Sequence, residues 1–324
     1  MKKTVLAFSG ISQHLKDKLN QAFHLLMIDP KVGNLKQQFE QLLPRAHGMI
    51  GAGRVLNQEI LQHAQQLKVI SSVSVGYDNY DVDYLNQRGI MLTNTPHVLT
   101  ESTADLAFAL LMSSARRVVE LDQWTKQGHW KRTVQPAHYG ADIYGKTLGI
   151  IGLGHIGAAM AKRARFGFNM NILHHSRHAK PELEHSLNAT FCDLNELLEQ
   201  SDFVSIHVAL NDQTQHLIGK LQLARMKKTA ILINVARGQV IDEQALIEAL
   251  SNQQILAAGL DVFEQEPLQH SELFQLPNVI TLPHVGSATL STRQAMDDLA
   301  FDNLSKALAG EQPPYCVNPH VLSR

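Results

Sequence analysis

Short apolar runs alternate with amphipathic stretches along most of the chain. The runs TVLAF, LLMID, GMIGA and KVISSVS carry apolar residues at consecutive positions, a pattern typical of strands that are buried on both faces. Between them, residues 12–24 and 57–67 repeat apolar positions at helical spacing. Strands that alternate with helices predict parallel βαβ units and an open sheet. The expected fold class is therefore α/β.

A second series of strands and helices begins at Lys146. Its expected strands are TLGII, NMNILHH, DFVSIHVAL, AILINVAR, LAAGLDVF and VITLPH. Between the two series, residues 99–128 predict one long helix that is apolar on more than one face, which suggests packing on both sides. Because 324 residues exceed one ordinary core, we expect two doubly wound domains.

Composition excludes several classes of function. Apolar residues make up 44% of the chain and charged residues 18%, as in folded proteins, and the formal net charge is −1. Since no long run of one sign occurs, we expect neither nucleic acid nor a membrane surface as a partner. The two cysteines, Cys192 and Cys316, have no metal-like spacing. They predict no metal site, no disulfide and a cytoplasmic protein.

A glycine-rich turn follows the first strand of the second series. The segment from Gly152 through Gly154 to Gly157 matches G-x-G-x-x-G, and it lies between the strand TLGII and the helix expected at IGAAMAKRARF. Gly152 permits the tight turn, Gly154 lets the backbone approach a pyrophosphate, and Gly157 lets the helix pack closely on the strand. The amides at the helix start, around His155 and Ile156, attract phosphates. This context favours a dinucleotide site over a turn without a ligand.

The end of the next strand bears on the choice of cofactor. An NAD site usually places Asp or Glu about 20 residues beyond the fingerprint, where it binds the ribose 2′-hydroxyl. Here the stretch HHSRHAK offers no carboxylate before Glu182. Ser176 and Arg177 can instead bind a 2′-phosphate through charge-assisted hydrogen bonds. We therefore expect NADPH, with NADH as the second choice; a solvated loop role for Arg177 is the alternative.

Three polar residues follow later strands of the same series. Arg237, Glu266 and His284 are expected at the carboxyl edge of the sheet, where open α/β sheets bind ligands. Arg237 suits a substrate carboxylate beside a carbonyl group, and His284 suits proton transfer to the oxygen that forms when hydride arrives from a nicotinamide. Glu266 beside the imidazole would favour its protonated form. The set predicts reduction of 2-oxo acids.

Each of these three residues also has a purely structural alternative. Arg237 can end a strand, Glu266 can belong to a surface turn before Pro267, and His284 can be a hydrogen-bonded core histidine. One titratable residue is weak evidence by itself. The functional interpretation depends on their order behind the dinucleotide fingerprint.

The segments GLGHIG, NVARGQVIDEQAL, AAGLDVFEQEP and PHVGSAT together resemble the D-isomer-specific 2-hydroxyacid dehydrogenase family, over essentially the whole chain. The resemblance implies that Arg237, Glu266 and His284 are catalytic. It further implies that Arg237 and His284 contact the substrate, whose carboxylate meets the backbone amides of Val75 and Gly76. The implied cofactor-binding residues, taken with the fingerprint and the loop after it, are Gly152, Gly154, His155, Ile156, Gly157, Ser176, Arg177, Ala236 and Asp261, the last holding the nicotinamide carboxamide.

The resemblance also implies domains and partners. Residues 1–98 and 289–324 would form a flavodoxin-like substrate domain, and residues 99–288 the dinucleotide-binding domain. A homodimer would form through the dinucleotide-binding domains and the helix at residues 101–120. The stretches FGFNMNIL, DVFEQEPL, PHVGSAT and CVNPHV are most similar to the branch that reduces glyoxylate and hydroxypyruvate, with 2-ketogluconate as a further candidate substrate.

Other members of the family leave alternatives open. A 3-phosphoglycerate dehydrogenase usually takes NAD, and the missing acidic residue after NILHH counts against it. Formate dehydrogenases have the same fold but pair Gln with His in the active site, whereas this chain has Glu266 with His284. A non-catalytic scaffold that senses the cofactor, as in the related transcriptional corepressors, would keep much of the same site. Turnover of a 2-oxo acid separates that scaffold from an enzyme.

Overall fold

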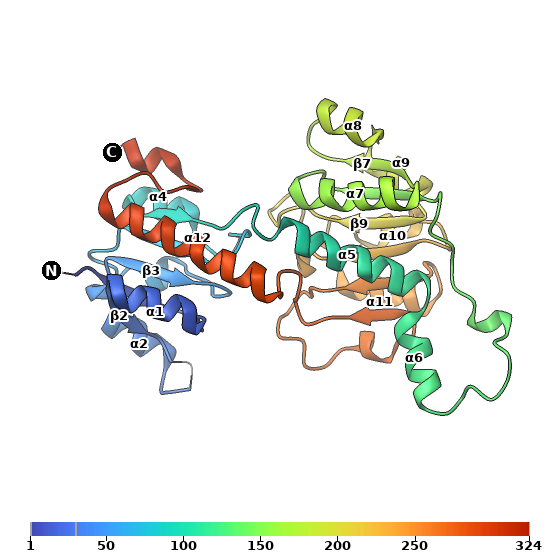
Figure 1. Ribbon diagram of the computed structural model, residues 1–324, viewed down its shortest axis with the longest axis horizontal. Coiled ribbons are helices and arrows are strands. Elements are labelled where there is room, and N and C mark those ends of the chain that lie inside the picture. Colours follow the sequence, from blue (N-terminus) through green and yellow to red (C-terminus); the bar gives the residue numbers. More distant parts are fainter. Residues whose placement is uncertain (1, 30, 324) are drawn as a thin grey trace. The chain divides into compact units, whose positions relative to one another are not determined.

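The computed structural model describes residues 2–29 and 31–323, which belong to two compact units (Figure 1). One unit comprises the chain up to Leu99 together with the part from Ala288 onward, and the other is Thr100–Ser287. Each unit contains one sheet of parallel strands, which confirms the α/β fold class with two Rossmann-like units. Among the described residues, no helix combines the length and the apolar character that crossing a bilayer requires.

The first unit contains a five-stranded sheet in the order β2-β1-β3-β4-β5, which is the flavodoxin-like order. Its strands are β1 (Thr4–Ala7), β2 (His24–Met27), β3 (Gly48–Gly51), β4 (Val69–Ser72) and β5 (Met91–Thr93). Its helices are α1 (Gln13–Ala22), α2 (Leu35–Leu42), α3 (Gln58–Leu61), α4 (Val82–Arg88) and α12 (Leu290–Ala309), with the short 3-10 helices η1 (Leu43–Arg45) and η5 (Pro319–Ser323).

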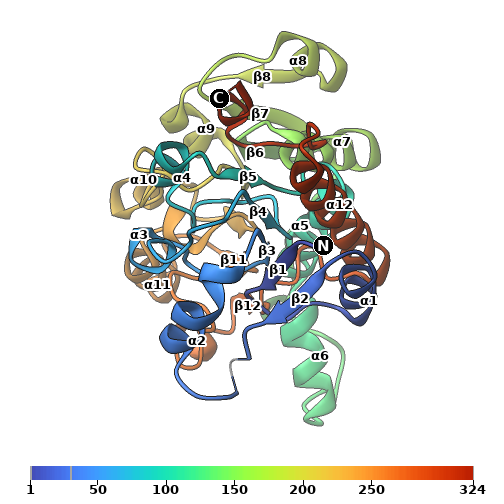
Figure 2. The same ribbon diagram turned by 90° about the vertical axis from the view of Figure 1, so that its left-hand side faces the viewer.

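Consecutive residues of β1 show why the strands of this sheet read as continuous apolar runs. Val5 and Ala7 pack in one cluster with α1 and α12, whereas Leu6 and Phe8 pack in another with the helices on the opposite face. Figure 2 shows α12 beside α1, at one side of this sheet. Because successive side chains of a strand point to opposite faces, a strand covered on both faces needs apolar residues at every position.

The second unit contains a seven-stranded sheet in the order β12-β11-β10-β9-β6-β7-β8. The order reverses between β6 and β9, so the glycine-rich turn after β6 lies at the topological switch point where such sheets bind nucleotides. The strands are β6 (Thr147–Ile151), β7 (Asn171–His175), β8 (Ala189–Phe191), β9 (Phe203–Ile206), β10 (Ile231–Asn234), β11 (Ala257–Leu260) and β12 (Val279–Thr281). The helices are α5 (Thr100–Ala115), α6 (Val118–Lys126), α7 (His155–Phe168), α8 (Pro181–Leu187), α9 (Leu194–Gln200), α10 (Lys220–Arg225) and α11 (Glu243–Ser251), with η2 (Pro136–His138), η3 (Gly238–Val240) and η4 (Glu272–Gln275).

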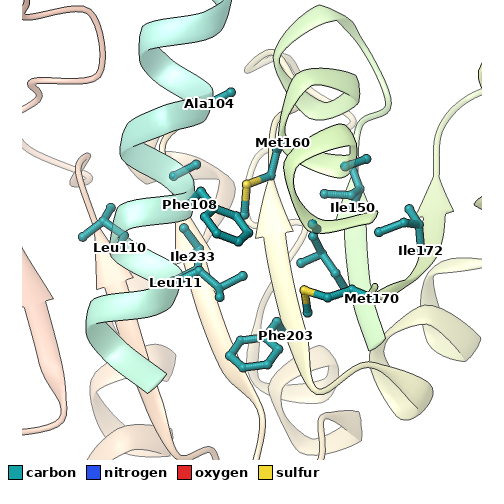
Figure 3. Packing of buried hydrophobic residues seen from close by; sticks show 14 of the residues in the cluster. Ala104, Phe108, Leu110, Leu111, Ile150, Met160, Met170, Ile172, Phe203 and Ile233 are labelled. Carbon is teal, nitrogen blue, oxygen red and sulfur yellow. The ribbon is translucent and has the colours of Figure 1, made fainter. Parts of the chain in front are cut away.

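Helices α5 and α7 share one apolar cluster with the strands beneath them (Figure 3). Phe108 of α5 stacks on Phe168 of α7, with 4.9 Å between ring centroids, and Met160 fills the space beside Phe108. Helices α9, α10 and α11 contribute to a second cluster of the same unit. The sheet that carries the glycine-rich turn is thus held rigid by packed helices.

The prediction of one long helix over residues 99–128 is wrong. The structure has α5 and α6 instead, and Arg117 between them takes the left-handed conformation, with φ at 53°. The carbonyl of Ala115 accepts the amide of Ala141 at 2.8 Å, and a side chain on Gly140 would contact that carbonyl. Helix α5 ends because residues 140 and 141, which are distant in the sequence, contact its last turn.

Candidate active site

The glycine-rich turn has the geometry that a dinucleotide requires. Gly152 has φ at 97°, and a Cβ there would lie 2.9 Å from the carbonyl of His207. A Cβ on Gly157 would contact the carbonyl of Gly152, so the close approach of α7 to β6 requires glycine. A Cβ on Gly154, which precedes α7, would meet no atom within 4 Å, and this glycine has no side chain to cap the helix. The start of α7 therefore suits an anion that the backbone can approach.

The loop after β7 is tied to this turn. The amide of Gly152 donates to the carbonyl of His175 at 2.8 Å, and the hydroxyl of Ser176 accepts the amide of Leu153 at 3.0 Å. Arg177 is exposed, and no residue in the described part of the chain accepts a hydrogen bond from its guanidinium. A role for Ser176 and Arg177 in binding a phosphate on the ribose of the cofactor stays a prediction.

The loop after β10 presents Arg237, and Asn234 shapes it. The buried side chain of Asn234 donates to the carbonyl of Arg237 at 2.9 Å and accepts the amide of Ala236 at 3.0 Å. Gly238 lies so close to the backbone of Phe263 that any side chain would overlap it. Glycine is therefore required at position 238, where the turn contacts the β11 loop, and the neighbouring Arg237 is half-buried.

The loop after β11 places Glu266 against His284 of the β12 loop. Oε2 of Glu266 lies 2.7 Å from Nδ1 of His284, and Oε1 accepts the amide of Phe263 at 3.0 Å. Because a carboxylate only accepts, Nδ1 carries the proton and Nε2 is left for a ligand. The His284 side chain remains 47% exposed and that of Glu266 35%, so His284 is not a core histidine.

The electrostatics of Glu266 link these three residues. Burial opposes its ionisation, but the hydrogen bond and charge of His284, the amide of Phe263 and the charge of Arg237 outweigh burial and lower the pKa of Glu266. Glu266 is therefore charged at neutral pH beside the imidazole. Arg237, Glu266 and His284 are thus brought together by loops from three strands.

Asp261 supports the turn that presents His284. Its side chain is 1% exposed, and its two oxygens accept the amides of Val285 at 2.7 Å and Gly286 at 2.8 Å. Burial raises the pKa of Asp261, and the two amides act in the opposite direction. His284 itself has φ at 54°, and its amide donates to the carbonyl of Asp261 at 2.9 Å. A role for Asp261 toward a nicotinamide stays a prediction.

Val75 and Gly76 belong to the other unit. Asn94 donates to the carbonyl of Val75 at 2.9 Å, and the hydroxyl of Ser74 donates to the carbonyl of Gly76 at 2.6 Å. No acceptor among residues 2–29 and 31–323 pairs with the amide of either residue. Their role in binding a carboxylate stays a prediction.

Two residues that shape the loops of this site were not predicted from the sequence. Asn234 is one of them, and its signal was an Asn at a strand end, which often bonds to its own following backbone. Glu264 is another: it accepts Nε2 of His216 at 2.7 Å, and its carbonyl accepts the side-chain amide of Gln239 at 2.8 Å. It thereby links the loops after β9, β10 and β11, and no local pattern predicts those contacts.

Comparison with known proteins places this geometry in a family. The NAD-binding domain of the D-isomer specific 2-hydroxyacid dehydrogenases matches residues 108–286. The glyoxylate/hydroxypyruvate reductase B of Serratia proteamaculans is 46% identical over the full length of both chains, and that of Erwinia tasmaniensis is 48% identical over 98% of this chain and all of its own.

Solved structures agree with these relatives. The NADPH-dependent glyoxylate/hydroxypyruvate reductase from Sinorhizobium meliloti, solved with NADP and malonate, has a TM-score of 0.87 at 32% identity, covering 98% of this chain and 97% of that one. A glyoxylate reductase from Paecilomyes thermophila has a TM-score of 0.88 at 32% identity, covering 98% of this chain and 99% of that one. The chain therefore belongs to the D-isomer specific 2-hydroxyacid dehydrogenase family.

Proposed function

We infer that this chain reduces small 2-oxo acids to D-2-hydroxy acids with a reduced nicotinamide dinucleotide. The observation that carries this function is the hydrogen bond between Nδ1 of His284 and Oε2 of Glu266, in a site that also receives the charge of Arg237. The glyoxylate/hydroxypyruvate reductases that it resembles over its full length support glyoxylate and hydroxypyruvate as substrates, and 2-ketogluconate is a further candidate.

His284 is the proton donor of this proposal. Oε2 of Glu266 accepts a hydrogen bond from Nδ1–H of His284, which orients the ring and stabilises the imidazolium, so Nε2 can give a proton to the substrate carbonyl oxygen. In the reverse direction the neutral ring accepts that proton. Glu266 does not itself receive the proton, because its lowered pKa keeps it ionised.

Arg237 binds the substrate through its carboxylate. A planar guanidinium forms paired hydrogen bonds with a carboxylate, and its charge polarises the adjacent carbonyl. Nη1 of Arg237 donates to the carbonyl of Ala236 at 2.8 Å, which helps to hold the guanidinium in the site. In the other unit, the carbonyls of Val75 and Gly76 are held by hydrogen bonds, and we propose their amides as substrate-binding groups.

The cofactor-binding residues favour NADPH over NADH. Bound at the turn from Gly152 to Gly157, the reduced nicotinamide would supply the hydride. Ser176 and exposed Arg177 offer a hydroxyl and a positive charge to a 2′-phosphate, and no carboxylate occupies the position that usually binds a 2′-hydroxyl. The unit of Thr100–Ser287 would thus be the dinucleotide-binding domain, and the other unit the substrate domain.

A spectrophotometric panel tests this function. The loss of reduced-nicotinamide absorbance is followed with glyoxylate, hydroxypyruvate and 2-ketogluconate, each with NADPH and with NADH. We expect turnover with glyoxylate and hydroxypyruvate and a higher kcat/KM with NADPH. Cofactor binding without turnover of any 2-oxo acid would instead support a cofactor-sensing scaffold.

A homodimer through α5 and α7 is the oligomeric state we propose. Phe166 of α7 is 66% exposed, and together with Met112 of α5 it lines a hollow between these helices. Exposed apolar residues of this kind favour association. The mass in solution of a Phe166→Glu variant tests this proposal, since a dimer on this face should dissociate.

We also propose the cytoplasm as the compartment of this protein. The two cysteines, Cys192 and Cys316, form no disulfide, as expected in a reducing compartment.

A further inference from the structure

One carboxylate oxygen holds both ends of the loop that follows β7. Oε1 of Glu184, on α8, lies 3.1 Å from Nε2 of His174 and accepts the amide of Lys180 at 2.5 Å. Residues 175–180, here called the phosphate loop, connect those two anchors and contain Ser176 and Arg177. The bonds from Glu184 therefore close the loop on itself.

The His174 anchor is a neutral donor. Its side chain is fully buried against the ring of Phe191, and burial is the main cause that lowers the pKa of His174. A neutral imidazole carries one proton, and a carboxylate can only accept, so the proton lies on Nε2 and points to Glu184. Nδ1 of His174 is buried without a partner among the described residues, as expected for the unprotonated nitrogen.

The Lys180 anchor completes the start of α8. Lys180 precedes the helix, Pro181 is its first residue, and the Lys180 side chain does not cap it. Glu184 bonds Lys180 twice, because its own amide donates to the Lys180 carbonyl at 2.8 Å while its carboxylate accepts the Lys180 amide. The arrangement is similar to a capping box, in which an acidic side chain of the first turn accepts the amide of the residue before the helix, although Glu184 lies one residue further along. It makes the end of the phosphate loop rigid.

Glu184 also brings a negative charge near a site proposed for a phosphate. The repulsion is screened, since the Glu184 side chain is 22% exposed and salt limits such effects to about 10 Å. A free loop of six residues, by contrast, must be ordered each time the 2′-phosphate binds, and that ordering weakens binding. The ordering of the phosphate loop by Glu184 thus strengthens NADPH binding, whereas the charge of Glu184 weakens it. Substitutions of Glu184 can separate the two effects.

We propose that Glu184 is a positioning residue that sets the preference for NADPH, by holding the phosphate loop in the conformation in which Ser176 and Arg177 meet the 2′-phosphate. The inference rests on the proposed function, because that function assigns the 2′-phosphate to these two residues. Glu184 itself touches no cofactor atom in this proposal. Because NADH lacks the 2′-phosphate, its binding should not depend on the conformation of the phosphate loop.

Equilibrium binding of NADPH and NADH to the full chain tests the proposal, with cofactor fluorescence as the readout. Glu184→Ala should weaken the binding of NADPH about tenfold, because two donors lose the acceptor that they share. It should change the affinity for NADH less than about twofold. Glu184→Gln keeps an oxygen acceptor without the charge, so it should bind NADPH within about twofold of wild type or more tightly. Glu182→Ala is the matched control, because Glu182 is exposed in the same first turn and forms no hydrogen bond within the described part of the chain; it should bind both cofactors like wild type.

Hydrogen exchange of the Lys180 amide, measured without cofactor, gives a second readout. Exchange should be faster in Glu184→Ala than in wild type and Glu184→Gln. The proposal is overturned if Glu184→Ala binds NADPH as tightly as wild type or more tightly, if it weakens both cofactors equally, or if the Lys180 amide stays protected. Arg177→Asp tests the proposed function in the same assay: if it weakens NADPH and NADH equally, the 2′-phosphate assignment fails and this inference with it. If Arg177→Asp selectively weakens NADPH and Glu184→Ala does not, the inference alone fails.

Discussion

Asp261→Asn is the substitution that most directly tests how the His284 turn is held. In the native protein the two oxygens of Asp261 accept the amides of Val285 and Gly286 at 2.7 and 2.8 Å. Asn keeps the shape but replaces one acceptor with an NH2 group, which would face an N–H that also donates. At a site that is 1% exposed, no solvent can replace the lost bond.

The expected magnitude follows from that loss. A hydrogen bond to a charged group contributes about 1.5–3 kcal/mol, so the free energy of unfolding of this unit should fall by about that amount. The melting temperature should fall by roughly 3–12 °C, at about 2–4 °C per kcal/mol for a domain of this size. His284 is held at φ 54°, which costs a non-glycine residue about 1–2 kcal/mol, so the weakened turn should relax. A shift of the imidazole by about 1 Å should lower kcat on the order of 10- to 100-fold.

The assay pairs thermal unfolding, followed by circular dichroism, with kcat and NADPH affinity. Asp193→Asn is the matched control, because Asp193 also accepts a backbone amide, that of Glu196 at 2.9 Å, and Asn caps a helix as well as Asp. The control should match wild type in both measurements. If Asp261→Asn melts and turns over like wild type, the carboxylate does not anchor the turn. If it is destabilised while kcat is unchanged, the turn does not position His284.

Three further substitutions test the electrostatics. His284→Ala should lower kcat about 10²–10⁴-fold, the usual contribution of a general acid, with NADPH affinity nearly unchanged; wild-type turnover would remove His284 from the mechanism. Glu266→Gln removes the carboxylate that accepts the Nδ1 hydrogen bond of His284, so kcat should fall about 10- to 100-fold, the effect of losing a hydrogen bond to a charged group; wild-type kcat contradicts the pairing. The pKa of Asp202 is lowered because Lys227 and the amide of Thr147 outweigh its burial, so its contribution to stability is complete above the unfolded pKa and is lost as pH falls through the folded pKa. Urea unfolding should accordingly show Asp202→Asn less stable than wild type at neutral pH, with a gap that narrows under acid; a gap independent of pH contradicts the argument.

The sequence alone determined most strands of both sheets and the glycine fingerprint, although it did not predict the short strand β8. TVLAF and TLGII are apolar at successive positions because β1 and β6 are covered on both faces, and this requirement is visible locally. The glycines at 152 and 157 were equally readable, since each removes a side chain that the turn cannot contain. The sequence also showed that Arg237, Glu266 and His284 each follow a predicted strand of the second series.

Local pattern misjudged helices whose limits depend on distant residues. The stretch around Arg117 has good helical propensity, yet the helix ends there because residues 140 and 141 meet the last turn of α5. The guanidinium of Arg117 then bonds Glu120 and the carbonyl of Ala137. Residues 57–67 similarly yield only α3 at Gln58–Leu61.

Only the tertiary structure decided which of these residues meet. Glu266 reaches His284 because β11 and β12 are neighbours in the sheet, and Asp261 reaches the His284 turn for the same reason. Glu184 closes the phosphate loop because α8 packs back beside β7, which no spacing along the chain encodes. Periodicity reports which face of an element is buried, whereas strand order and loop path set the distances between side chains, and chemistry depends on those distances.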